Sequence, residues 1–425
     1  MNRIRTGIAA VLGLGLALAL LVAPAMPAQA STGSGTINVK PGQLITAKFS
    51  GTKLDKNRTV TLSSSADGVT WTTVSGQTKK MSAKGAVTFS VVASDGKHYR
   101  ATANTFKYKV KKKSYTAPAV TTLSRTAEQP TWAEEFSDLA IWKHRTDVGY
   151  QAQGRHCSAP IEANATASGG VARLKVTEVK SGRTSIIAQA KEYQKAEAGS
   201  AYKSAEAKLA KANAMKNKTK AEKKKRTAAI KKANDALKKL APGCPSGVYN
   251  NAMITSNGNF SISKGTVVAQ VKFAVGQGSH GGIWLQDGAT RQEIDIIESY
   301  GYGQGVTSLV HRASNGKLVQ DPKDPKKAYV GVKAAANKKW WSAWHTVAVT
   351  FDSNKVTFYL DGVKTNELKG MTGDYSLIVS QLSSDWETSR WKKPAVRSGS
   401  GVKKSSVKKT SLPTMQVNWI RAWQG

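Results

Sequence analysis

Polar and apolar residues alternate along most of the chain, which is the pattern of half-buried β-strands. In the first quarter of the chain the alternating runs are short, and turn pairs such as Pro41-Gly42 and Asp95-Gly96 separate them. Several short strands at this spacing predict an immunoglobulin-like β-sandwich over residues 31–112. Residues 113–129 are rich in Ser, Thr, Ala and Pro and are predicted to be a linker.

A second β unit is predicted over residues 130–425, and a helical insertion interrupts it at about residues 185–240. Within the insertion, apolar residues recur at 3-4-3 spacing, which places them on one face of a helix. The two sets are Tyr202, Ala205, Leu209 and Ala212, and Ile230, Ala233, Leu237 and Leu240. With a turn at Asn217-Lys-Thr-Lys between them, these sets predict an antiparallel helical hairpin packed as a coiled coil. The expected fold class is therefore all-β, with one inserted α-helical hairpin.

One strand-like segment carries three acidic residues in a pattern that strict alternation does not explain. Glu293 and Asp295 face one side of the strand, and Ile294 faces the other. Strict alternation then places Glu298 on the apolar side. One extra residue at Ile296-Ile297, a β-bulge, restores the phase and brings all three carboxylates to one face, and bulges are common beside active sites.

Three carboxylates on one face repel one another, so such an arrangement is expected only where the chemistry of a site requires it. Glycoside hydrolysis requires carboxyl groups placed in this way. The retaining reaction uses two carboxyl groups about 5 to 5.5 Å apart, one as nucleophile and one as general acid and base. At ~3.3 Å per residue, the Cα atoms of Glu293 and Glu298 are more than ~10 Å apart, so their side chains must converge across a curved strand. The pattern therefore predicts a glycosidase site in which the shorter Asp295 lies between two glutamates.

The motif Glu293-x-Asp295-x-x-Glu298, followed by Ser-Tyr-Gly, resembles the signature of glycoside hydrolase family 16, the laminarinase and agarase type of endo-β-glycanase. The resemblance extends over most of residues 130–425. Segments that resemble other strands of the family follow in the family's order: Trp132 to Phe136, Tyr249 to Ser256, Gly282 to Leu285, Trp344 to Val349, Val356 to Gly362 and Met415 to Gln424. The helical insertion has no counterpart in the family's common pattern.

The resemblance implies a jelly-roll sandwich of the concanavalin type and a retaining mechanism. It assigns Glu293 as the nucleophile, Glu298 as the general acid and base, and Asp295 as the carboxylate that orients and tunes Glu293. We expect the neighbouring negative charges to raise the pKa of Glu298, because a like charge disfavours ionisation. The alternatives are a polysaccharide-binding protein that does not cut and a structural cationic protein, neither of which needs three crowded carboxylates.

Aromatic and histidine residues near the acidic strand are candidates for binding the substrate. Trp284 lies one strand earlier, where the resemblance implies stacking on a sugar; a core Trp is the alternative. His311 lies one strand later and is expected to hydrogen-bond Asp295 or the sugar; a structural His is the alternative. Trp386 resembles a cleft Trp of the family.

Two departures from the family pattern affect the expected substrate. His280-Gly281-Gly282 stands where laminarinase-like members have Trp-Pro-Ala, and Gln292, with Arg291 beside it, replaces the Gly that usually precedes the first glutamate. These changes are expected to reshape one end of the cleft. With His280 and Arg291 at its edge, the cleft is predicted to suit an acidic cell-wall glycan at least as well as plain β-1,3-glucan.

The chain has 64 Lys and Arg residues against 27 Asp and Glu residues, a formal net charge of +37. So large an excess indicates an anionic partner or surface and says little about the fold. The insertion contributes sixteen basic and five acidic residues, and residues 392–409 form a second basic segment. A solvated decoration is the leading interpretation of the hairpin, ahead of an arm that binds an anionic polymer. Nucleic-acid binding is the least favoured, because few aromatic residues are available for stacking on bases.

Residues 1–30 have the layout of a secretory signal, with Arg3 and Arg5 before an apolar run that ends at about Val22. The small residues at Ala28-Gln-Ala30 are typical of a cleavage site. No other apolar run reaches membrane-spanning length. We therefore expect a secreted protein, which its charge would allow to associate with a cell wall.

The two cysteines, Cys157 and Cys244, lie on either side of the helical insertion. In an oxidising compartment they are expected to form a disulfide at its base; two separate buried thiols are the alternative. No Cys/His cluster has metal-ligand spacing and no phosphate-binding loop occurs, so no metal or cofactor is predicted. The resemblance allows a structural calcium ion, for which no ligands are assigned. The linkage of the substrate and the oligomeric state are left open.

Overall fold

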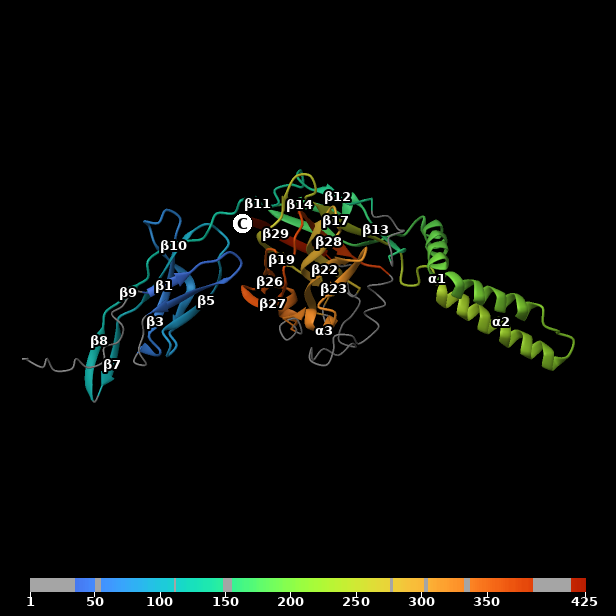
Figure 1. The fold of residues 1–425 in the computed structure, drawn as a ribbon, viewed down its shortest axis with the longest axis horizontal. Helices are drawn as coiled ribbons and strands as arrows, with labels where there is room; N and C mark the ends of the chain where they lie inside the picture. The colour runs from blue at the N-terminus through green and yellow to red at the C-terminus, as the bar shows by residue number, and fades with distance from the viewer. Residues whose placement is uncertain are drawn as a thin grey trace, which may run out of the picture.

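The computed structural model describes most of the chain, and Figure 1 shows how its elements are arranged. The described residues are 35–49, 55–110, 112–147, 155–275, 278–301, 305–331, 337–384 and 414–425. A small β unit, a larger β unit and a helical hairpin follow one another along the longest axis of the molecule (Figure 1). Three predicted features lie outside the described residues: the signal over residues 1–30, the cleft residue Trp386, and the basic segment 392–409.

The N-terminal unit consists of two small sheets around one core, and a separate two-stranded sheet of β7 and β8. One sheet has the strand order β1-β2-β5, and the other has the order β10-β6-β3-β4, with β9 also paired to β6. The strands are β1 (Gly35–Asn38), β2 (Leu44–Phe49), β3 (Thr59–Ser65), β4 (Thr72–Lys80), β5 (Ala86–Val92), β6 (His98–Ala103), β7 (Phe106–Val110), β8 (Lys113–Ala117), β9 (Val120–Thr121) and β10 (Arg125–Thr126). Alternate side chains such as Val60 and Leu62 on β3 are fully buried between the sheets. Two packed sheets agree with the predicted sandwich, and its immunoglobulin-like character remains a prediction.

The predicted linker over residues 113–129 is largely built into this unit. Residues of β8 pair with β7, and both β9 and β10 pair with β6. The hydroxyl oxygens of Thr102 and Thr121 lie 2.9 Å apart across one of these pairs, and Ala127 is buried in the core. The structure therefore corrects the linker prediction, because Ser and Thr suit an edge strand as well as they suit a linker.

The two β units contact each other directly. The backbone nitrogen of Leu44 donates to the carbonyl oxygen of Gly362 at 3.2 Å, and Arg421 Nη1 donates to the carbonyl oxygen of Ser94 at 2.6 Å. A Cβ atom at Gly362, whose φ is 74°, would lie 2.8 Å from the nitrogen of Leu44. The close approach of the two β units at this turn therefore requires glycine.

The second unit is a sandwich of two large sheets. The eight-stranded sheet has the order β14-β15-β29-β19-β25-β26-β27, with β11 paired to β29. Its strands are β11 (Trp132–Glu134), β14 (Ala165–Ser168), β15 (Val171–Lys175), β19 (Gly265–Lys272), β25 (His345–Phe351), β26 (Lys355–Leu360), β27 (Val363–Lys369) and β29 (Thr414–Gln424). The first strand of this unit thus pairs with the last, as β11 lies against β29.

The eleven-stranded sheet carries the acidic strand, β21. Its main order is β12-β17-β28-β20-β21-β22-β23, and four short strands pair at its margins. The strands are β12 (Lys143–His144), β13 (Ser158–Pro160), β16 (Thr177–Glu178), β17 (Tyr249–Thr255), β18 (Ser261–Ile262), β20 (His280–Asp287), β21 (Glu293–Ser299), β22 (Val306–Ser314), β23 (Lys317–Asp321), β24 (Tyr329–Val330) and β28 (Tyr375–Leu382). The short helices are η2 (Glu162–Asn164), α3 (Pro325–Ala328) and α5 (Lys338–Trp341).

One hydrophobic core fills the space between the two sheets. Val267 and Val349 enter it from the eight-stranded sheet, and Ile283 and Leu285 enter it from β20; all four are fully buried. Because successive residues of a strand point to opposite faces, the residues that alternate with this core on β20 and β21 face outward. The core therefore holds the outward face of β20 and β21 in place, and that face forms the candidate site.

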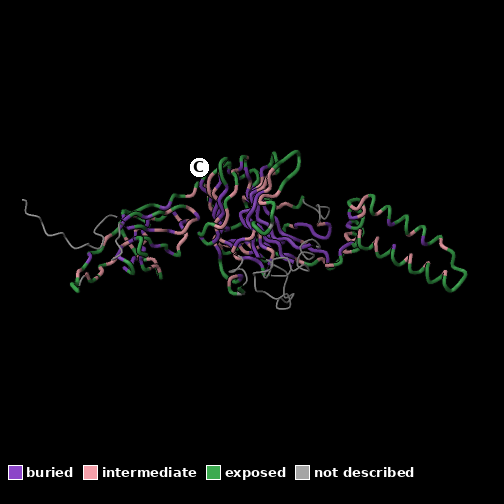
Figure 2. Tube along the Cα trace, turned by 60° about the horizontal axis from the view of Figure 1, so that its bottom comes forward, coloured by how far each residue is buried: buried purple, intermediate pink, exposed green. Residues whose placement is uncertain are grey.

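The helical insertion forms a hairpin of α1 (Arg183–Asn213) and α2 (Lys220–Leu240), as predicted. The buried residues along the shared part of the helices are small ones of the predicted stripes, Ala205 and Ala212 on α1 and Ala233 on α2. Figure 2 shows that the rest of the hairpin is mostly exposed. Within the described part of the chain, no helix is long and apolar enough to cross a membrane.

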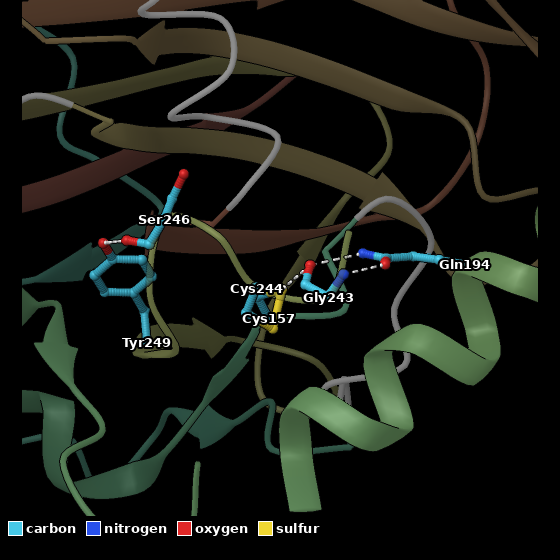
Figure 3. Close-up of a disulfide and its surroundings, with 6 residues drawn as sticks. All are labelled: Cys157, Gln194, Gly243, Cys244, Ser246 and Tyr249. Carbon is cyan, nitrogen blue, oxygen red and sulfur yellow. Dashed lines mark hydrogen bonds between the residues drawn. A yellow bond between two sulfur atoms is a disulfide. The ribbon is translucent and has the colours of Figure 1, made fainter. Parts of the chain in front are cut away.

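The base of the hairpin is held by a disulfide between Cys157 and Cys244, which confirms the predicted pairing (Figure 3). Gln194 on α1 exchanges two hydrogen bonds with the backbone of Gly243, at 2.8 and 3.0 Å. Next to these contacts α1 kinks at Gly199, whose φ of 48° is not helical. The first part of α1 therefore packs on the β unit, and the second part pairs with α2.

Candidate active site

The acidic strand β21 contains the predicted bulge. On β20, Ile283 lies opposite Ile297 and Trp284 lies opposite Asp295, so Ile296 has no partner of its own. Ile296 and Ile297 are both buried in the core. The extra residue therefore returns Glu298 to the outward face of the strand.

The neighbouring strand β22 supports the bulge with a hydrogen bond. Leu309 lies opposite Asp295 and Thr307 lies opposite Glu298, which leaves Ser308 alone beside the inserted residue. The Ser308 hydroxyl donates to the carbonyl oxygen of Ile296 at 2.8 Å. This bond satisfies a buried backbone acceptor that the irregular ladder would otherwise leave unpaired.

The outward face of β20, β21 and β22 is hollowed into a cleft with a volume of about 400 Å³. Its lining residues are Arg145, Arg155, Met253, His280, Gly282, Trp284, Gln286, Arg291, Glu293, Asp295, Glu298, Tyr300, Leu309, His311, Gln320, Ser380 and Leu382. The cleft thus contains all three predicted acidic residues. It also contains four of the five residues predicted to bind substrate, and Trp386 is the fifth, outside the described residues.

Glu293 is held from two sides. Gln286 Nε2 on β20 donates to Glu293 Oε1 at 2.8 Å, and His311 Nδ1 on β22 lies 3.3 Å from Glu293 Oε2. Arg145 Nη1 donates in turn to the Gln286 side-chain oxygen at 3.2 Å. These contacts fix the direction of the Glu293 carboxylate toward the cleft.

Asp295 is the most buried of the three acids, with 4% of its surface exposed. Burial and the nearby charge of Glu298 raise the pKa of Asp295 to about 7, although His311 Nδ1 lies 3.2 Å from its Oδ2. Burial alone would lower the pKa of His311, but contacts with Asp295 and Glu293 raise it to about 10. At neutral pH, His311 is therefore an imidazolium ion that pairs with this acidic cluster.

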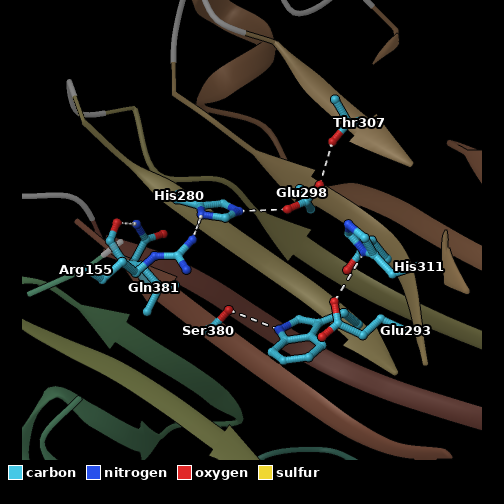
Figure 4. A network of polar contacts seen from close by, with 11 residues as sticks. Arg155, His280, Glu293, Glu298, Thr307, His311, Ser380 and Gln381 are labelled. Atoms are coloured by element: carbon cyan, nitrogen blue, oxygen red, sulfur yellow. Dashed lines mark hydrogen bonds and ion pairs between the residues drawn. The ribbon is translucent and has the colours of Figure 1, made fainter. Parts of the chain in front are cut away.

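Glu298 differs from Asp295 because both of its oxygens accept hydrogen bonds (Figure 4). His280 Nε2 lies 2.8 Å from Glu298 Oε1, and the Thr307 hydroxyl donates to Oε2 at 3.0 Å. Burial opposes ionisation of Glu298, yet these contacts, with His280 the strongest, lower its pKa to about 2. The structure thus corrects the expectation that like charges raise the pKa of Glu298, because the raised pKa belongs to Asp295.

His280 lies against Glu298 and is nearly buried, not at the rim of the cleft as its sequence position suggested. Its Nδ1 lies 3.2 Å from Arg155 Nη2 (Figure 4). Because a guanidinium group can only donate, Nδ1 must accept this bond, and Nε2 then carries the proton that faces Glu298. Arg155 therefore sets the tautomer of His280 that favours the Glu298 carboxylate.

Trp284 lines the floor of the cleft, as predicted. Its Nε1 donates to the Ser380 hydroxyl at 3.2 Å, which fixes the ring beside the acids. A Cβ atom at Gly282 would lie 3.3 Å from the Trp284 ring and would point into the cleft beside it. Gly282 therefore keeps open the space between Trp284 and Glu298. Arg291 lines the cleft from the turn between β20 and β21, with φ of 61°.

One group in the cleft has the donor atoms for a metal ion. Oxygen atoms of Glu293 and Asp295 and a ring nitrogen of His311 lie within 4.8 Å of one another. The raised pKa of His311 keeps its ring protonated at neutral pH, and an imidazolium ion has no lone pair for a metal. His311 therefore occupies the place of a cation in this cluster.

Sequence reasoning missed the groups that hold the acids in place. Gln286 and Thr307 touch the glutamates from the neighbouring strands, and a strand pairing could have suggested them once the bulge was known. Arg145 and Arg155 come from segments more than a hundred residues earlier in the chain. Nothing in their local sequence indicates a place in the cleft.

A known protein family matches much of this chain. The sequence model of glycosyl hydrolases family 16 matches residues 206–420, about half of the chain. The chain belongs to glycosyl hydrolase family 16. This confirms the resemblance that the acidic motif predicted. Membership of the family implies a retaining glycoside hydrolase. The larger β unit is a family-16 jelly-roll domain, and it carries a helical insertion.

Several solved structures are similar to this family-16 chain, and three of them each cover 70% of its length. The laminarinase catalytic domain of Thermotoga maritima MSB8 is 15% identical, with a TM-score of 0.41 and 98% of its own chain covered. The endo-1,3-beta-glucanase catalytic domain of Thermotoga petrophila RKU-1 is 14% identical, with a TM-score of 0.41 and 97% covered. The laminarinase of Flavobacterium sp. UMI-01 is 11% identical, with a TM-score of 0.40 and 100% covered. No curated protein matches the sequence.

Proposed function

We propose that this family-16 protein is a secreted, retaining endo-β-glycosidase that acts on a β-linked polysaccharide. The main support is the bulge on β21, which directs Glu293, Asp295 and Glu298 into one cleft of a family-16 domain. The disulfide between Cys157 and Cys244 supports export, because such bonds persist in oxidising compartments.

In the proposed reaction, Glu293 attacks the anomeric carbon while Glu298 gives a proton to the leaving glycosidic oxygen. This step breaks the glycosidic bond and forms a glycosyl ester on Glu293. Water then gives a proton to Glu298, attacks the same carbon and releases Glu293. A sugar hydroxyl in place of water would make the reaction a transglycosylation.

The proton for the first step comes from the carboxyl cluster. Between pH values of about 2 and 7, the pKa values of Glu298 and Asp295 leave one proton on the two groups, and in the free protein Asp295 carries it. Two acids that interact this strongly titrate together, so the proton is available to either one. A bound sugar removes water from Glu298 and raises its pKa, which favours transfer of the proton to the reacting position.

The residues that line the cleft support a polysaccharide chain as the substrate. Trp284 offers a ring for stacking against a sugar, and Ser380 and Gln286 offer polar contacts. We propose β-1,3-glucan or an acidic cell-wall glycan as substrate. The first option draws on the laminarinases among the similar structures, and the second on the basic residues in the cleft.

Product analysis tests this proposal. The mature protein and its Glu298→Gln variant are incubated with neutral and acidic β-glycans, and released oligosaccharides are separated by size. We expect the wild type to release oligosaccharides from at least one polymer and the variant to release none. Equal release by both proteins, or no release from any polymer, would contradict the proposal.

A second candidate function is attachment to an anionic cell-wall polymer without catalysis. The hairpin of α1 and α2 supports it, because it extends away from the β units and exposes many lysines (Figures 1 and 2). Retention on cell envelopes that falls with salt and is unchanged in Glu293→Gln would show attachment. Catalysis by the wild type would show that attachment serves an enzyme.

A further inference from the structure

A second hollow adjoins the cleft on the side of Glu293. Its volume is about 390 Å³, and it shares Arg145, Gln286 and Arg291 with the cleft. The other lining residues are Lys143, His144, Asp147, Thr255, Asn257, Asp287, Gly288, Ser376 and Ile378. A polysaccharide that lies in the cleft can therefore continue into this hollow.

Two of the three Lys and Arg side chains that line this hollow have no ion-pair partner in the described part of the chain. Among the described residues, no carboxylate lies within ion-pairing distance of Lys143 or Arg291. Arg145 forms a long ion pair, at 3.9 Å, with Asp147, whose side chain is 73% exposed. Each of these cations would gain from an anionic ligand, because an exposed pair at that distance contributes little.

The second acid of the hollow is already engaged. Asp287 accepts hydrogen bonds from the backbone nitrogens of Ala289 and Thr290 and from the Thr290 hydroxyl. These bonds belong to the turn between β20 and β21 and lower the pKa of Asp287. Its carboxylate therefore stabilises the turn that carries Arg291, and among the described residues it forms no ion pair with Lys143, Arg145 or Arg291.

The hollow is also connected to the catalytic centre. Arg145 donates to the side-chain oxygen of Gln286, and the Gln286 amide donates to Glu293. A ligand held by Arg145 thus lies one side chain away from the glutamate that attacks the sugar. Concave, low-dielectric walls concentrate the field of such cations and attract a ligand of opposite charge.

We propose that the hollow lined by Lys143, Arg145 and Arg291 is a subsite for an anionic substituent, a carboxylate or a sulfate ester, on a sugar of the substrate. The inference rests on the proposed glycosidase function and narrows its substrate class to acidic β-glycans. The planar guanidinium groups of Arg145 and Arg291 match either anion with paired hydrogen bonds. Lys143, which is exposed, adds a third positive charge.

The test compares polymers that share a backbone and differ in charge. β-1,3-glucan, β-1,4-glucan and mixed-linkage β-glucan are each used in neutral form, after oxidation of C6 to a carboxylate, and after partial sulfation. The proteins are the wild type, the double variant Lys143→Gln/Arg291→Gln, and the control Lys84→Gln/Lys107→Gln. The control removes the same charge from exposed positions of the N-terminal unit.

The readout is the ratio of kcat/KM for the charged polymer to that for its neutral parent. We expect the wild type to favour a charged form by about tenfold or more, because hydrogen bonds to charged groups are strong. The double variant should lose most of this ratio, and the control should keep it. An equal ratio in wild type and double variant would overturn the inference. The form of the polymer that the wild type cleaves with the higher kcat/KM, carboxylated or sulfated, identifies the substituent.

A binding experiment separates this inference from the proposed function. Affinities of the inactive Glu298→Gln protein for the same polymers are measured with and without Lys143→Gln; Lys143 is exposed, so we expect this change to leave the fold intact. Preference for a charged form that Lys143→Gln weakens supports the subsite even if the wild type cuts no polymer. Cutting without any preference for charge would leave the glycosidase standing and remove the subsite.

Discussion

The cleft and the helical hairpin both carry many charged side chains, and they hold charge in opposite ways. In the cleft, Glu293, Asp295 and Glu298 are buried or nearly so, and His280 and His311 lie against them at 2.8 to 3.3 Å. On the hairpin, lysines lie in water, with local ion pairs such as Lys195–Glu192 and Lys231–Asp235.

The difference shows that burial and close contacts, and not the number of charged side chains, shift pKa values toward those needed for proton transfer. Burial and nearby charged or hydrogen-bonding groups raise the pKa of Asp295 to about 7 and lower that of Glu298 to about 2. These opposite shifts occur on the same strand, β21. Most lysines of the hairpin are exposed to water. Its charge can attract a polymer but cannot transfer a proton. Five predictions test this contrast.

The largest effect is expected from the acids themselves. Glu293→Gln and Glu298→Gln should each lower kcat on the order of 10³-fold or more, because each removes a group that reacts directly. Glu162→Gln, a change of an exposed glutamate in the same domain, serves as the matched control. Rates are measured as reducing ends released per minute. A Glu293→Gln protein that retains the wild-type rate would refute the assignment.

The stability of the hairpin is expected to depend on the disulfide at its base more than on its charged side chains. Replacing Cys157 and Cys244 by Ser should cost about 2–4 kcal/mol of stability, since the disulfide closes a long loop. The loss should be local, because the small core beneath the hairpin is separate from the core of the sandwich. Limited proteolysis is expected to cut the hairpin first while polysaccharide cleavage persists. Simultaneous loss of both would show that the hairpin and the cleft are coupled.

His280 is a positioning residue whose removal should change the pH dependence of the reaction. In His280→Phe the donor to Glu298 is lost, so the pKa of Glu298 rises and the alkaline limb of kcat/KM moves to higher pH. The other groups that face Glu298 are Thr307, Asp295 and His311. His98→Phe, in the N-terminal unit, is the control. A limb that stays in place or moves to lower pH would contradict this role.

His311 should make the fold less stable as the pH rises above neutrality. Its pKa is about 10 in the folded chain against an ordinary value of 6.5. The stability it contributes is therefore complete below pH 6.5 and lost as the pH passes 10. Urea unfolding of wild type and His311→Asn between pH 7 and 10, above the pKa of Asp295, should show a decline only in the wild type. Parallel curves would mean that the His311 ring is not charged.

The smallest effect on fold and rate is expected from the lysines of the hairpin. Changing Lys224, Lys225, Lys232 and Lys239 to Gln should leave the urea midpoint and the hydrolysis of a soluble oligosaccharide unchanged, because these side chains are exposed. Binding to an anionic polymer at low salt should weaken, and the salt dependence should become less steep. A large loss of turnover would mean that the hairpin charges act on the cleft.

Much of the fold of these two regions could be predicted from the sequence, because it follows from the periodicity of apolar and polar residues. The phase slip between Asp295 and Glu298 predicted the bulge, and the 3-4-3 spacing of Ala205 and its neighbours predicted the hairpin. The kink at Gly199 could not be predicted, since a glycine within a helix pattern is also compatible with a straight helix.

The protonation of the acids could not be predicted from the local sequence. The low pKa of Glu298 depends on His280 and, through its tautomer, on Arg155, which lies 125 residues before His280. Like-charge repulsion is visible in a sequence motif, whereas hydrogen bonds from distant segments appear only when the chain is folded. The strands at residues 113–126 were missed for a related reason, because their pairing with β6 is a tertiary contact.

The stereochemistry of the first product tests the central claim most directly, that Glu293 and Glu298 converge across the bulge to perform a double displacement. The polymer that the wild type cuts is incubated at high enzyme concentration, and proton NMR follows the new reducing ends before mutarotation. The account predicts that the β-anomer appears first and equilibrates slowly with the α-anomer. Initial appearance of the α-anomer would show direct displacement by water and would contradict the account.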